Sequence, residues 1–230
     1  MTRILGAPGV VAIVPARAGS RGLPGKNLAT VGGTSLVGRA VRAARAAGVQ
    51  TVAVSTDGAE IAAEATRLDA TVVHRPLALA ADDSRTVDAL LHVADTLALD
   101  LDTLLVLLQP TSPLRGPEDV AAVLDRHAVG DVRTTLTVCQ AEHHPYKELV
   151  LNSSGRAVPV HDWSALEAPR QQLPPAYRIN GAVYAVAVGD LRRAGAVVVP
   201  DVAVVEMPEH RSIDIDGAAD LARARKLADG

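Results

Sequence analysis

The sequence of 230 residues contains no phenylalanine, and aromatic residues make up only 2% of it. Its core must therefore be built from Val, Leu, Ile and Ala. The lone cysteine, Cys139, excludes an internal disulfide, and we expect it in the core rather than as a nucleophile. Because neither a signal peptide nor a run of about 18 apolar residues is seen, we expect a cytoplasmic protein without a membrane partner.

The chain also lacks an excess of positive charge. Its formal net charge is −3, which argues against a nucleic-acid partner. The arginines near the N-terminus therefore need a local explanation, such as a small anionic ligand. A hydrophobic content of 48% is enough for a full core, and we expect a single domain over residues 1–230.

Apolar runs and amphipathic segments alternate along the first half of the chain. Strands are predicted at residues 10–14, 51–55, 71–73 and 103–108, and helices at 35–47, 59–68, 86–99 and 118–127. Further strands are predicted at 133–138, 180–188 and 202–207, before a final helix at 218–228. This order predicts an α/β fold of three layers, with helices on both faces of a mainly parallel, mixed sheet.

Residues 140–179 interrupt this pattern with polar, proline-rich sequence. A long, weakly patterned insertion in a compact domain is usually functional. We expect an inserted arm that contacts a partner subunit or the substrate, with a hairpin over residues 146–160 that turns at Ser154 and Gly155. His143 and His144 are adjacent and would face opposite ways on a strand, so we expect an exposed loop there rather than a metal pair.

A glycine-rich, basic loop follows the first predicted strand: Pro15-Ala-Arg-Ala-Gly-Ser-Arg-Gly-Leu-Pro-Gly-Lys-Asn27. Open α/β sheets bind ligands at the carboxyl ends of their strands, so the loop is predicted to bind phosphate. It is not a Walker loop, because five residues separate Gly19 from Gly25 and Asn27 replaces the hydroxyl that would bind magnesium. It also lacks the Gly-x-Gly-x-x-Gly pattern of dinucleotide-binding proteins.

Two further segments are expected at the same crevice. Gln109-Pro-Thr-Ser-Pro-Leu-Arg115 ends an apolar strand in a rigid turn. In Ser212-Ile-Asp-Ile-Asp216, alternate side chains of an extended segment share a face, so Asp214 and Asp216 should project together. Two carboxylates so placed suit a magnesium ion that is also bound to phosphates.

Together with Val54-Ser-Thr-Asp57, Arg75-Pro76 with Leu79-Ala80 and Asp82, and Asn180-Gly-Ala-Val-Tyr184, these motifs resemble those of the acylneuraminate cytidylyltransferase family, the CMP-sugar synthetases. The motifs occur in the family's order and span nearly the whole chain. The resemblance implies a Rossmann-like nucleotidyltransferase fold in which residues 140–179 form a dimerisation arm.

The resemblance also implies roles for individual residues. Arg17, Lys26, Asp214 and Asp216 would be catalytic, and the two aspartates would bind Mg²⁺. The CTP site would comprise Arg17, Ser20, Arg21, Lys26, Asn27, Arg75, Asp82 and Thr86. The site of a small anionic acceptor would comprise Gln109, Thr111, Ser112, Arg170, Gln171, Asn180 and Tyr184. The first three of these could instead contact the ribose of the nucleotide, and Arg170 and Gln171 would reach a neighbouring subunit in a homodimer.

The implied reaction is attack of an acceptor hydroxyl on the α-phosphorus of CTP with release of pyrophosphate. Positioning and charge neutralisation would carry most of the catalysis, and either aspartate could also accept the proton. No aromatic residue occurs in Leu191-Arg-Arg-Ala-Gly-Ala-Val-Val-Val-Pro200, where family members that use sialic acid commonly place rings. The acceptor is therefore open between a nonulosonic acid such as sialic acid, a 3-deoxy-octulosonate and an alkylphosphonate; a regulator that only binds nucleotide is the least favoured alternative.

Overall fold

The computed structural model of the chain describes residues 9–20, 22–81 and 83–228. Arg21 and Asp82, both predicted to lie in the nucleotide site, fall outside the described residues. The helices are α1 (Leu36–Ala46), α2 (Ala59–Arg67), α3 (Thr86–Thr96), α4 (Pro117–Val129), α5 (Trp163–Glu167), α6 (Val188–Ala194) and α7 (Ala218–Ala228). Short 3₁₀ turns lie at Lys26–Leu28, Leu77–Leu79, Pro145–Lys147, Arg170–Gln172 and Glu209–Arg211.

A seven-stranded sheet forms the centre of the molecule, in the order β11-β7-β10-β6-β1-β4-β5. Its strands are β1 (Val10–Pro15), β4 (Thr51–Thr56), β5 (Thr71–His74), β6 (Leu104–Leu107), β7 (Thr134–Gln140), β10 (Tyr177–Ala187) and β11 (Val202–Glu206). Strand β10 runs antiparallel to both of its neighbours, and the other described pairings in the sheet are parallel. The expectation of a mainly parallel, mixed sheet is confirmed.

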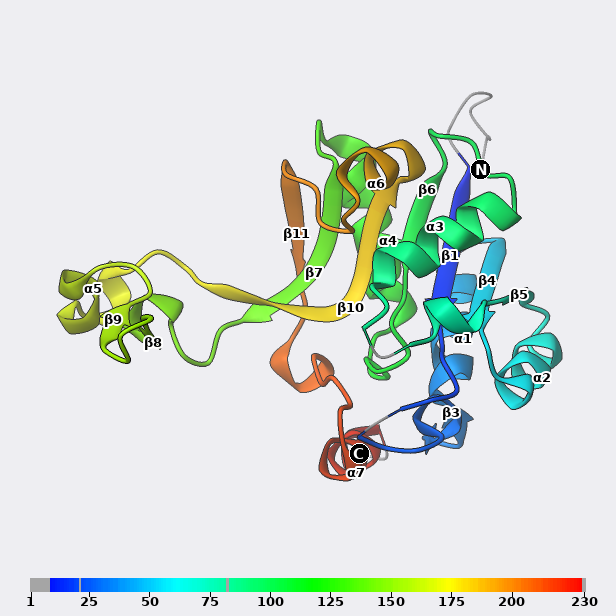
Figure 1. Ribbon diagram of the computed structural model, residues 1–230, viewed down its shortest axis with the longest axis horizontal. Helices are drawn as coiled ribbons and strands as arrows, with labels where there is room; N and C mark the ends of the chain where they lie inside the picture. The colour runs from blue at the N-terminus through cyan, green and yellow to red at the C-terminus, as the bar shows by residue number, and fades with distance from the viewer. Residues whose placement is uncertain (1–8, 21, 82, 229–230) are drawn as a thin grey trace.

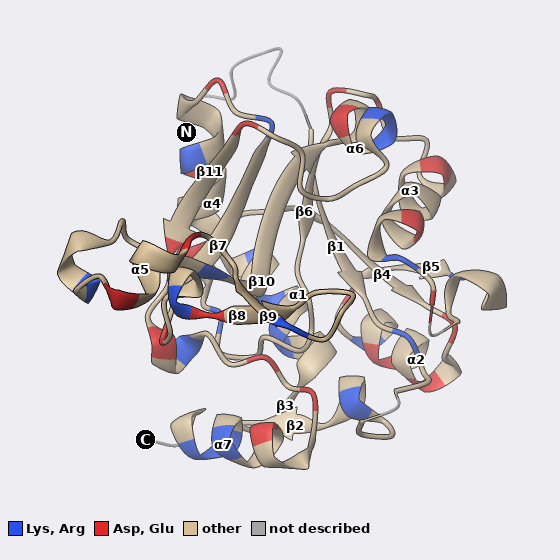
Figure 2. Cartoon of the chain, turned by 60° about the vertical axis from the view of Figure 1, so that its left-hand side comes forward, with Lys and Arg blue, Asp and Glu red and all other residues tan. Residues whose placement is uncertain are grey.

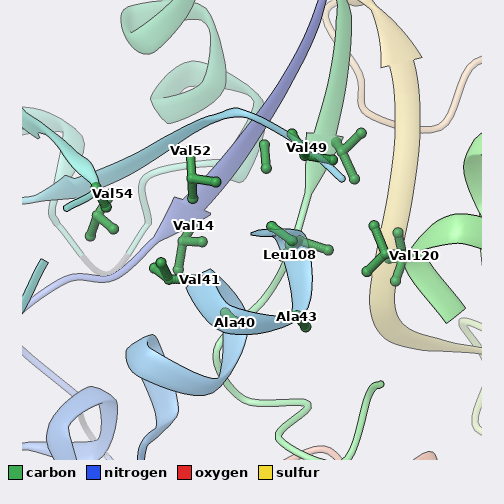
Figure 3. Packing of buried hydrophobic residues seen from close by; sticks show 14 of the residues in the cluster. Val14, Ala40, Val41, Ala43, Val49, Val52, Val54, Leu108 and Val120 are labelled. Atoms are coloured by element: carbon green, nitrogen blue, oxygen red, sulfur yellow. The ribbon is translucent and has the colours of Figure 1, made fainter. Parts of the chain in front are cut away.

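Helices cover both faces of the sheet (Figure 1). Helices α1, α2 and α4 pack on one face through residues such as Val41, Ile61 and Val120. Figure 3 shows this layer, in which small aliphatic side chains of α1 lie against Val14, Val54 and Leu108 from the strands. Helices α3 and α6 cover the opposite face, so the three-layer arrangement is confirmed.

The core clusters consist of aliphatic side chains, as the composition predicts, with Tyr184 packed against one of them. Strand β6 is buried along its whole length because it lies between β1 and β10 and beneath helices on both faces. Helix α1 buries Leu36, Val37, Ala40, Val41 and Ala44, whereas Arg42 and Arg45 lie on its exposed side. Cys139 is fully buried, as expected.

A smaller cluster joins the C-terminal helix to the start of the chain. Leu221 and Ala224 of α7 pack with Ile213, Ile215 and Val31, the last in the hairpin formed by β2 (Thr30–Val31) and β3 (Thr34–Ser35). This cluster fixes the segment that carries Asp214 and Asp216 beside the glycine-rich loop.

Residues 141–176 leave the sheet between β7 and β10 and form an arm that projects from the body (Figure 1). Its antiparallel hairpin consists of β8 (Leu149–Leu151) and β9 (Ala157–Pro159), with Gly155 in the left-handed conformation at the turn. The predicted hairpin is therefore confirmed. The arm is slightly shorter than the predicted range 140–179, because Tyr177–Ile179 already pair with β7.

The arm exposes several apolar side chains. Leu149 and Leu151 of β8 are exposed, and the side chain of Trp163 on α5 is 64% exposed. Acidic and basic residues are interspersed over the body, the arm and α7 (Figure 2). In the part of the chain that the structure describes, no helix has both the length and the apolar character needed to span a membrane.

Two sequence-based expectations need correction. Helix α3 ends at Thr96, not at residue 99, since Ala98 has a positive φ of 48°. The strand predicted at 180–188 ends at Ala187, and the next residues form helix α6, which has only seven residues and packs against α3.

Candidate active site

A cleft of about 490 Å³ lies at the carboxyl ends of the central strands. The glycine-rich loop contributes Arg17, Ser20 and Lys26, and the turn after β6 contributes Gln109 and Thr111. The other residues that line it are Pro15, Gly22, Asn27, Arg75, Leu79, Ala81, Ser84, Arg85, Thr86, Ala89, Pro110 and Asp216. The structure thus brings together all six of the described residues that were predicted to bind nucleotide.

Positive charge dominates the cleft. Arg17, Lys26, Arg75 and Arg85 line it, whereas Asp216 is the acidic residue among the described lining residues. Arg85 was not predicted to lie in the site. Its position next to the predicted site residue Thr86, at the N-terminus of α3, is the sequence feature that could have indicated it. This imbalance favours a ligand with several negative charges.

Hydrogen bonds from neighbouring segments hold the loop in shape. The carboxylate of Asp57, at the end of β4, accepts from the backbone N–H of Ala18 at 2.8 Å. The buried side chain of Asn27 donates to the carbonyl of Arg17, also at 2.8 Å. Asn27 therefore lines the cleft and also joins the two ends of the loop through this hydrogen bond.

Arg75 is positioned by the ends of β4 and β5. Its guanidinium donates to the hydroxyl and the carbonyl of Ser55 and to the carbonyl of Leu79. Burial lowers the pKa of Arg75, and the carboxylate of Asp57 opposes this shift. A guanidinium fixed in this way presents its charge to the cleft in a set orientation.

The loop and the Asp-x-Asp segment are in direct contact. Lys26 Nζ donates to the carbonyl of Ile215 at 2.7 Å and lies 3.8 Å from the carboxylate of Asp216. Gly22 approaches the same segment so closely that a Cβ atom there would lie 2.2 Å from the carbonyl oxygen of Asp216. Glycine at position 22 is therefore required by this close approach.

Asp214 and Asp216 share the exposed side of their segment, as the alternation predicts, because Ile213 and Ile215 are buried on the other side. The two carboxylates nevertheless face different spaces. Asp216 lines the main cleft, whereas Asp214 lines an adjoining cavity of about 240 Å³ near the base of the arm. The other charged residues that line this cavity are Glu142, Arg178, Glu209, Asp220 and Arg223.

The surroundings of Asp214 tie it to the turn after β6. Partial desolvation raises the pKa of the Asp214 carboxyl, a hydrogen bond from Thr111 opposes this, and the neighbouring Asp216 adds to the rise. The backbone N–H of Ile215 also donates to the carbonyl of Thr111. Tyr184 packs beside the core, and burial followed by the charge of Asp214 raises its pKa.

A bulge in β10 connects the turn to the neighbouring strand. Gly181 has a φ of +77° and lies against the side chain of Gln109, and the pairing with β7 shifts between Ile179 and Tyr184. Arg115, at the end of the turn, is buried and donates to the carbonyls of Gln109 and Ala182. It therefore fixes the turn from within.

Several predicted acceptor residues lie outside the lining of the main cleft. Asn180 is buried, where it accepts from Thr137 and donates to Ser212. Ser112 is also buried. Arg170 lies in the arm, where it donates to the carbonyl of Ala141, and Gln171 follows it in the same 3₁₀ turn. Contacts of these residues with an acceptor, and those of Tyr184, remain predictions.

The expectation of an exposed loop at His143 and His144 is wrong for His144. Its ring is buried: Nδ1 accepts from the backbone of Tyr146, and Nε2 lies 2.9 Å from the carbonyl of Pro174. The ring thereby joins the two chain segments at the base of the arm. The sequence offered no signal for this tertiary contact.

The donor set fits a magnesium ion only with help from a substrate. In the described part of the chain, no three His, Cys, Asp or Glu side chains gather into a metal-binding group. Mg²⁺ is commonly bound by one or two carboxylates together with substrate phosphates and water. The pair Asp214 and Asp216 beside a basic cleft matches this pattern.

Comparisons with solved structures agree with the fold. A solved CMP:2-keto-3-deoxy-manno-octonic acid synthetase in complex with CTP superposes with a TM-score of 0.71 at 21% identity, covering 95% of this chain and 98% of that one. A 4-diphosphocytidyl-2C-methyl-D-erythritol synthase from Anaerococcus prevotii gives a TM-score of 0.67 at 14% identity, over 97% of both chains. These likenesses confirm the nucleotidyltransferase fold.

Sequence comparison gives the family. The CMP-N,N'-diacetyllegionaminic acid synthase of Legionella pneumophila is 32% identical over 95% of each chain. An N-acylneuraminate cytidylyltransferase of Streptococcus agalactiae is 29% identical over 76% of this chain, which matches only 42% of that protein's length. The sequence model of the family described as cytidylyltransferase matches residues 11–206. The chain therefore belongs to the cytidylyltransferase family and is a CTP-dependent nucleotidyltransferase.

Proposed function

We propose that this protein transfers CMP from CTP to the hydroxyl group of a nonulosonic acid of the N-acylneuraminate type and releases pyrophosphate. The observation that carries the proposal is the cleft in which the basic glycine-rich loop, the turn after β6 and the Asp-x-Asp segment meet. The Legionella relative, whose name couples CMP to a diacetylated sugar acid, supports the acceptor class.

The geometry supports a division of the site into two halves. The cations Arg17, Lys26 and Arg75 line the main cleft and would bind the triphosphate, together with Ser20 and Thr86. The cavity at Asp214 adjoins it and holds Arg178, a cation suited to a carboxylate of the acceptor. The reacting hydroxyl would then approach from the side of Asp214.

In this arrangement, the chain's own residues position the substrates and neutralise the charge of the phosphates. Lys26 is fixed by the carbonyl of Ile215, so its charge is in place before pyrophosphate leaves. Thr111 orients the carboxylate of Asp214. Asp214 or Asp216 would accept the proton of the attacking hydroxyl, and backbone amides of the loop would donate to phosphate oxygens.

We propose that Asp214 and Asp216 also hold Mg²⁺ when CTP is bound. The ion would supply charge neutralisation on the phosphates and a lower pKa for the attacking hydroxyl. Because the two carboxylates face adjoining cavities, one on the nucleotide side and one on the acceptor side, they are suited to hold a cation between the two substrates.

The arm supports the proposal of a homodimer. Its exposed apolar residues are typical of a surface that is buried against a partner. In addition, Arg170 and Gln171 are not among the described residues that line the cleft of their own chain. In a dimer, these two residues would reach the partner's acceptor cavity. Use of CTP and the single, buried cysteine, which leaves no internal disulfide to form, support the cytoplasm as its location.

A pyrophosphate-release assay tests the proposal. The protein is incubated with CTP and Mg²⁺, and the acceptor is varied among N-acetylneuraminate, a diacetylated nonulosonate, a 3-deoxy-octulosonate and an alkylphosphonate. We expect release with an N-acylated nonulosonate. If only the octulosonate or the phosphonate supports pyrophosphate release, that compound replaces the nonulosonate as the proposed acceptor. If the protein binds CTP but releases no pyrophosphate with any of the acceptors, the proposed transfer is contradicted.

A further inference from the structure

A second basic cavity lies beside the turn after β6. The turn runs between two spaces: residues 109–111 line the main cleft, and residues 114–116 line a groove of about 340 Å³. Helix α1 forms the opposite wall of the groove, and the start of α4 forms its end. The charged residues that line it are Arg39, Arg42, Arg115, Arg211 and Glu118.

Two of these arginines bind only neutral groups. Arg39 donates to the carbonyls of Pro113 and Val31, and Arg42 donates to the hydroxyl of Thr34 at 3.0 Å. Among the described residues, neither guanidinium has a carboxylate within ion-pair distance. Their positive charges are therefore not neutralised by a direct partner.

Arg115 adds a buried charge at the floor of the groove. Only 4% of the residue is exposed, one of its terminal nitrogens donates to two carbonyls, and its Nε has no hydrogen-bond partner within the described chain. Burial lowers the pKa of Arg115 to about 10; the carboxylate of Asp119 opposes this shift, and Arg39 adds to it. The group therefore stays charged at neutral pH, and a buried donor without a partner is costly.

The acidic residues are concentrated at the other end of the groove. Arg211 binds Asp119 through two hydrogen bonds of 2.9 and 3.0 Å and also pairs with Glu118. The carboxylate of Glu118 lies against Gly116 at the start of α4. The carboxylate of Asp119 also attracts Arg115, and that of Glu64 attracts Arg42, both without a direct ion pair. The direct ion pairs of the groove are thus those of Arg211, and Arg39 and Arg42 add positive charge without a carboxylate in direct contact.

We propose that this groove binds a small phosphate-type oxyanion between Arg39, Arg42 and Arg115. All three arginines line the groove, and guanidinium groups can bind several oxygens of such an anion at once. The anion is coupled to the main cleft, because Arg39 and Arg115 both hold carbonyls of the 109–115 turn. Its binding changes the apparent affinity for CTP by altering how firmly that turn is held.

Calorimetric titration tests the site directly. Inorganic phosphate is titrated into the whole protein saturated with CTP in the absence of acceptor, so that the main cleft is already filled; pyrophosphate is titrated in a second series to compare the two anions. We expect Arg42→Gln to weaken phosphate binding at least tenfold. Arg45→Gln is the matched control, since Arg45 lies on the same exposed side of α1 but outside the groove; we expect a change of less than twofold.

A third variant should shift the affinity the other way. Glu118→Gln removes the negative charge that lines the groove, so we expect it to tighten phosphate binding several-fold. CTP binding by every variant confirms that it is folded. Absence of phosphate binding to the CTP-saturated wild type, or equal binding to Arg42→Gln, would overturn the site.

The coupling has its own readout. We expect phosphate to change the KM for CTP in the wild-type protein and to leave it unchanged in Arg42→Gln. An identical phosphate effect on both proteins would locate its action in the main cleft and refute the coupling.

Discussion

At the scale of single residues, the site depends on close contacts that the motifs alone do not reveal. The sequence placed Lys26 and the two aspartates in one site, and the structure joins them through the carbonyl of Ile215. Polar groups such as Asn27 and Asn180 serve the framework through bonds to Arg17 and Ser212. A motif identifies which residues gather, but tertiary packing decides which of their atoms face the ligand.

Gly22→Ala tests the contact between the loop and the Asp-x-Asp segment. Its Cβ would lie 2.2 Å from the carbonyl of Asp216, so the two segments must separate. Because misplacement of a catalytic group by about 1 Å can cost roughly 10²-fold in rate, we expect kcat to fall at least tenfold with little change in the melting temperature. Gly19→Ala is a comparison in the same loop, where a Cβ meets nothing within 4 Å; an equal loss in both variants would contradict the argument.

Asp214→Asn should lower turnover by orders of magnitude while the protein stays folded. The carboxylate lies on the exposed side of its segment, and its removal leaves the packing of Ile213 and Ile215 intact. Rates of pyrophosphate release and circular dichroism measure the two effects. Asp201→Asn serves as the control, since Asp201 is exposed at the start of β11 and pairs with Arg133. Near-normal turnover of Asp214→Asn would refute the catalytic assignment.

At the scale of helices and strands, the side chain of Ser35 both caps the start of α1 and links it to α2. Ser35 accepts from the backbone N–H of Gly38 and donates to the carboxylate of Glu64 at 2.6 Å. Since loss of a serine N-cap typically costs about 1 kcal/mol, we expect Ser35→Ala to lower the free energy of unfolding by about that amount. Chemical denaturation at neutral pH measures the change.

The same contact predicts a pH dependence. The bond from Ser35 lowers the pKa of Glu64, followed by a smaller contribution from Arg67. Its stabilisation is therefore full above the ordinary carboxyl pKa of 4.5 and is lost as the pH falls below it. The stability difference between wild type and Ser35→Ala should be larger at neutral pH than at about pH 3. Glu64→Gln should remove this pH dependence, and a difference that stays constant with pH would contradict the mechanism.

Most elements of the body could be predicted because hydrophobic periodicity is a local property. The prediction of 218–228 for α7 matches the structure, and α1, α2, β4 and β11 differ by one or two residues. Helix α6 and the buried ring of His144 could not be predicted in this way, since both depend on contacts with distant segments such as α3 and Pro174. The antiparallel direction of β10 also follows from the path of the arm, which no local pattern encodes.

At the scale of the whole molecule, the proposed homodimer would form through the arm. Leu149 and Leu151 are exposed on its hairpin, and burial of a leucine side chain contributes about 1.5–3 kcal/mol. We therefore expect replacement of both by glutamate to convert a dimer into a monomer and to reduce activity, because Arg170 would no longer reach a partner's cavity. Sedimentation velocity measures the first effect.

Val129→Glu is the control for this prediction. Val129 is 86% exposed at the end of α4, on the body rather than the arm. It should leave the oligomeric state unchanged. A monomeric wild-type protein with full activity would contradict the proposed role of the arm.

The near absence of aromatic residues has an optical consequence. Trp163 is the only tryptophan of the sequence, and it lies on the arm with 64% of its side chain exposed. Its fluorescence therefore reports on the surroundings of α5 and not on the aliphatic core. Covering the arm would shift the emission to shorter wavelengths, whereas loss of the central sheet alone would leave the indole in water. The chain thus carries a native spectroscopic reporter for its projecting segment.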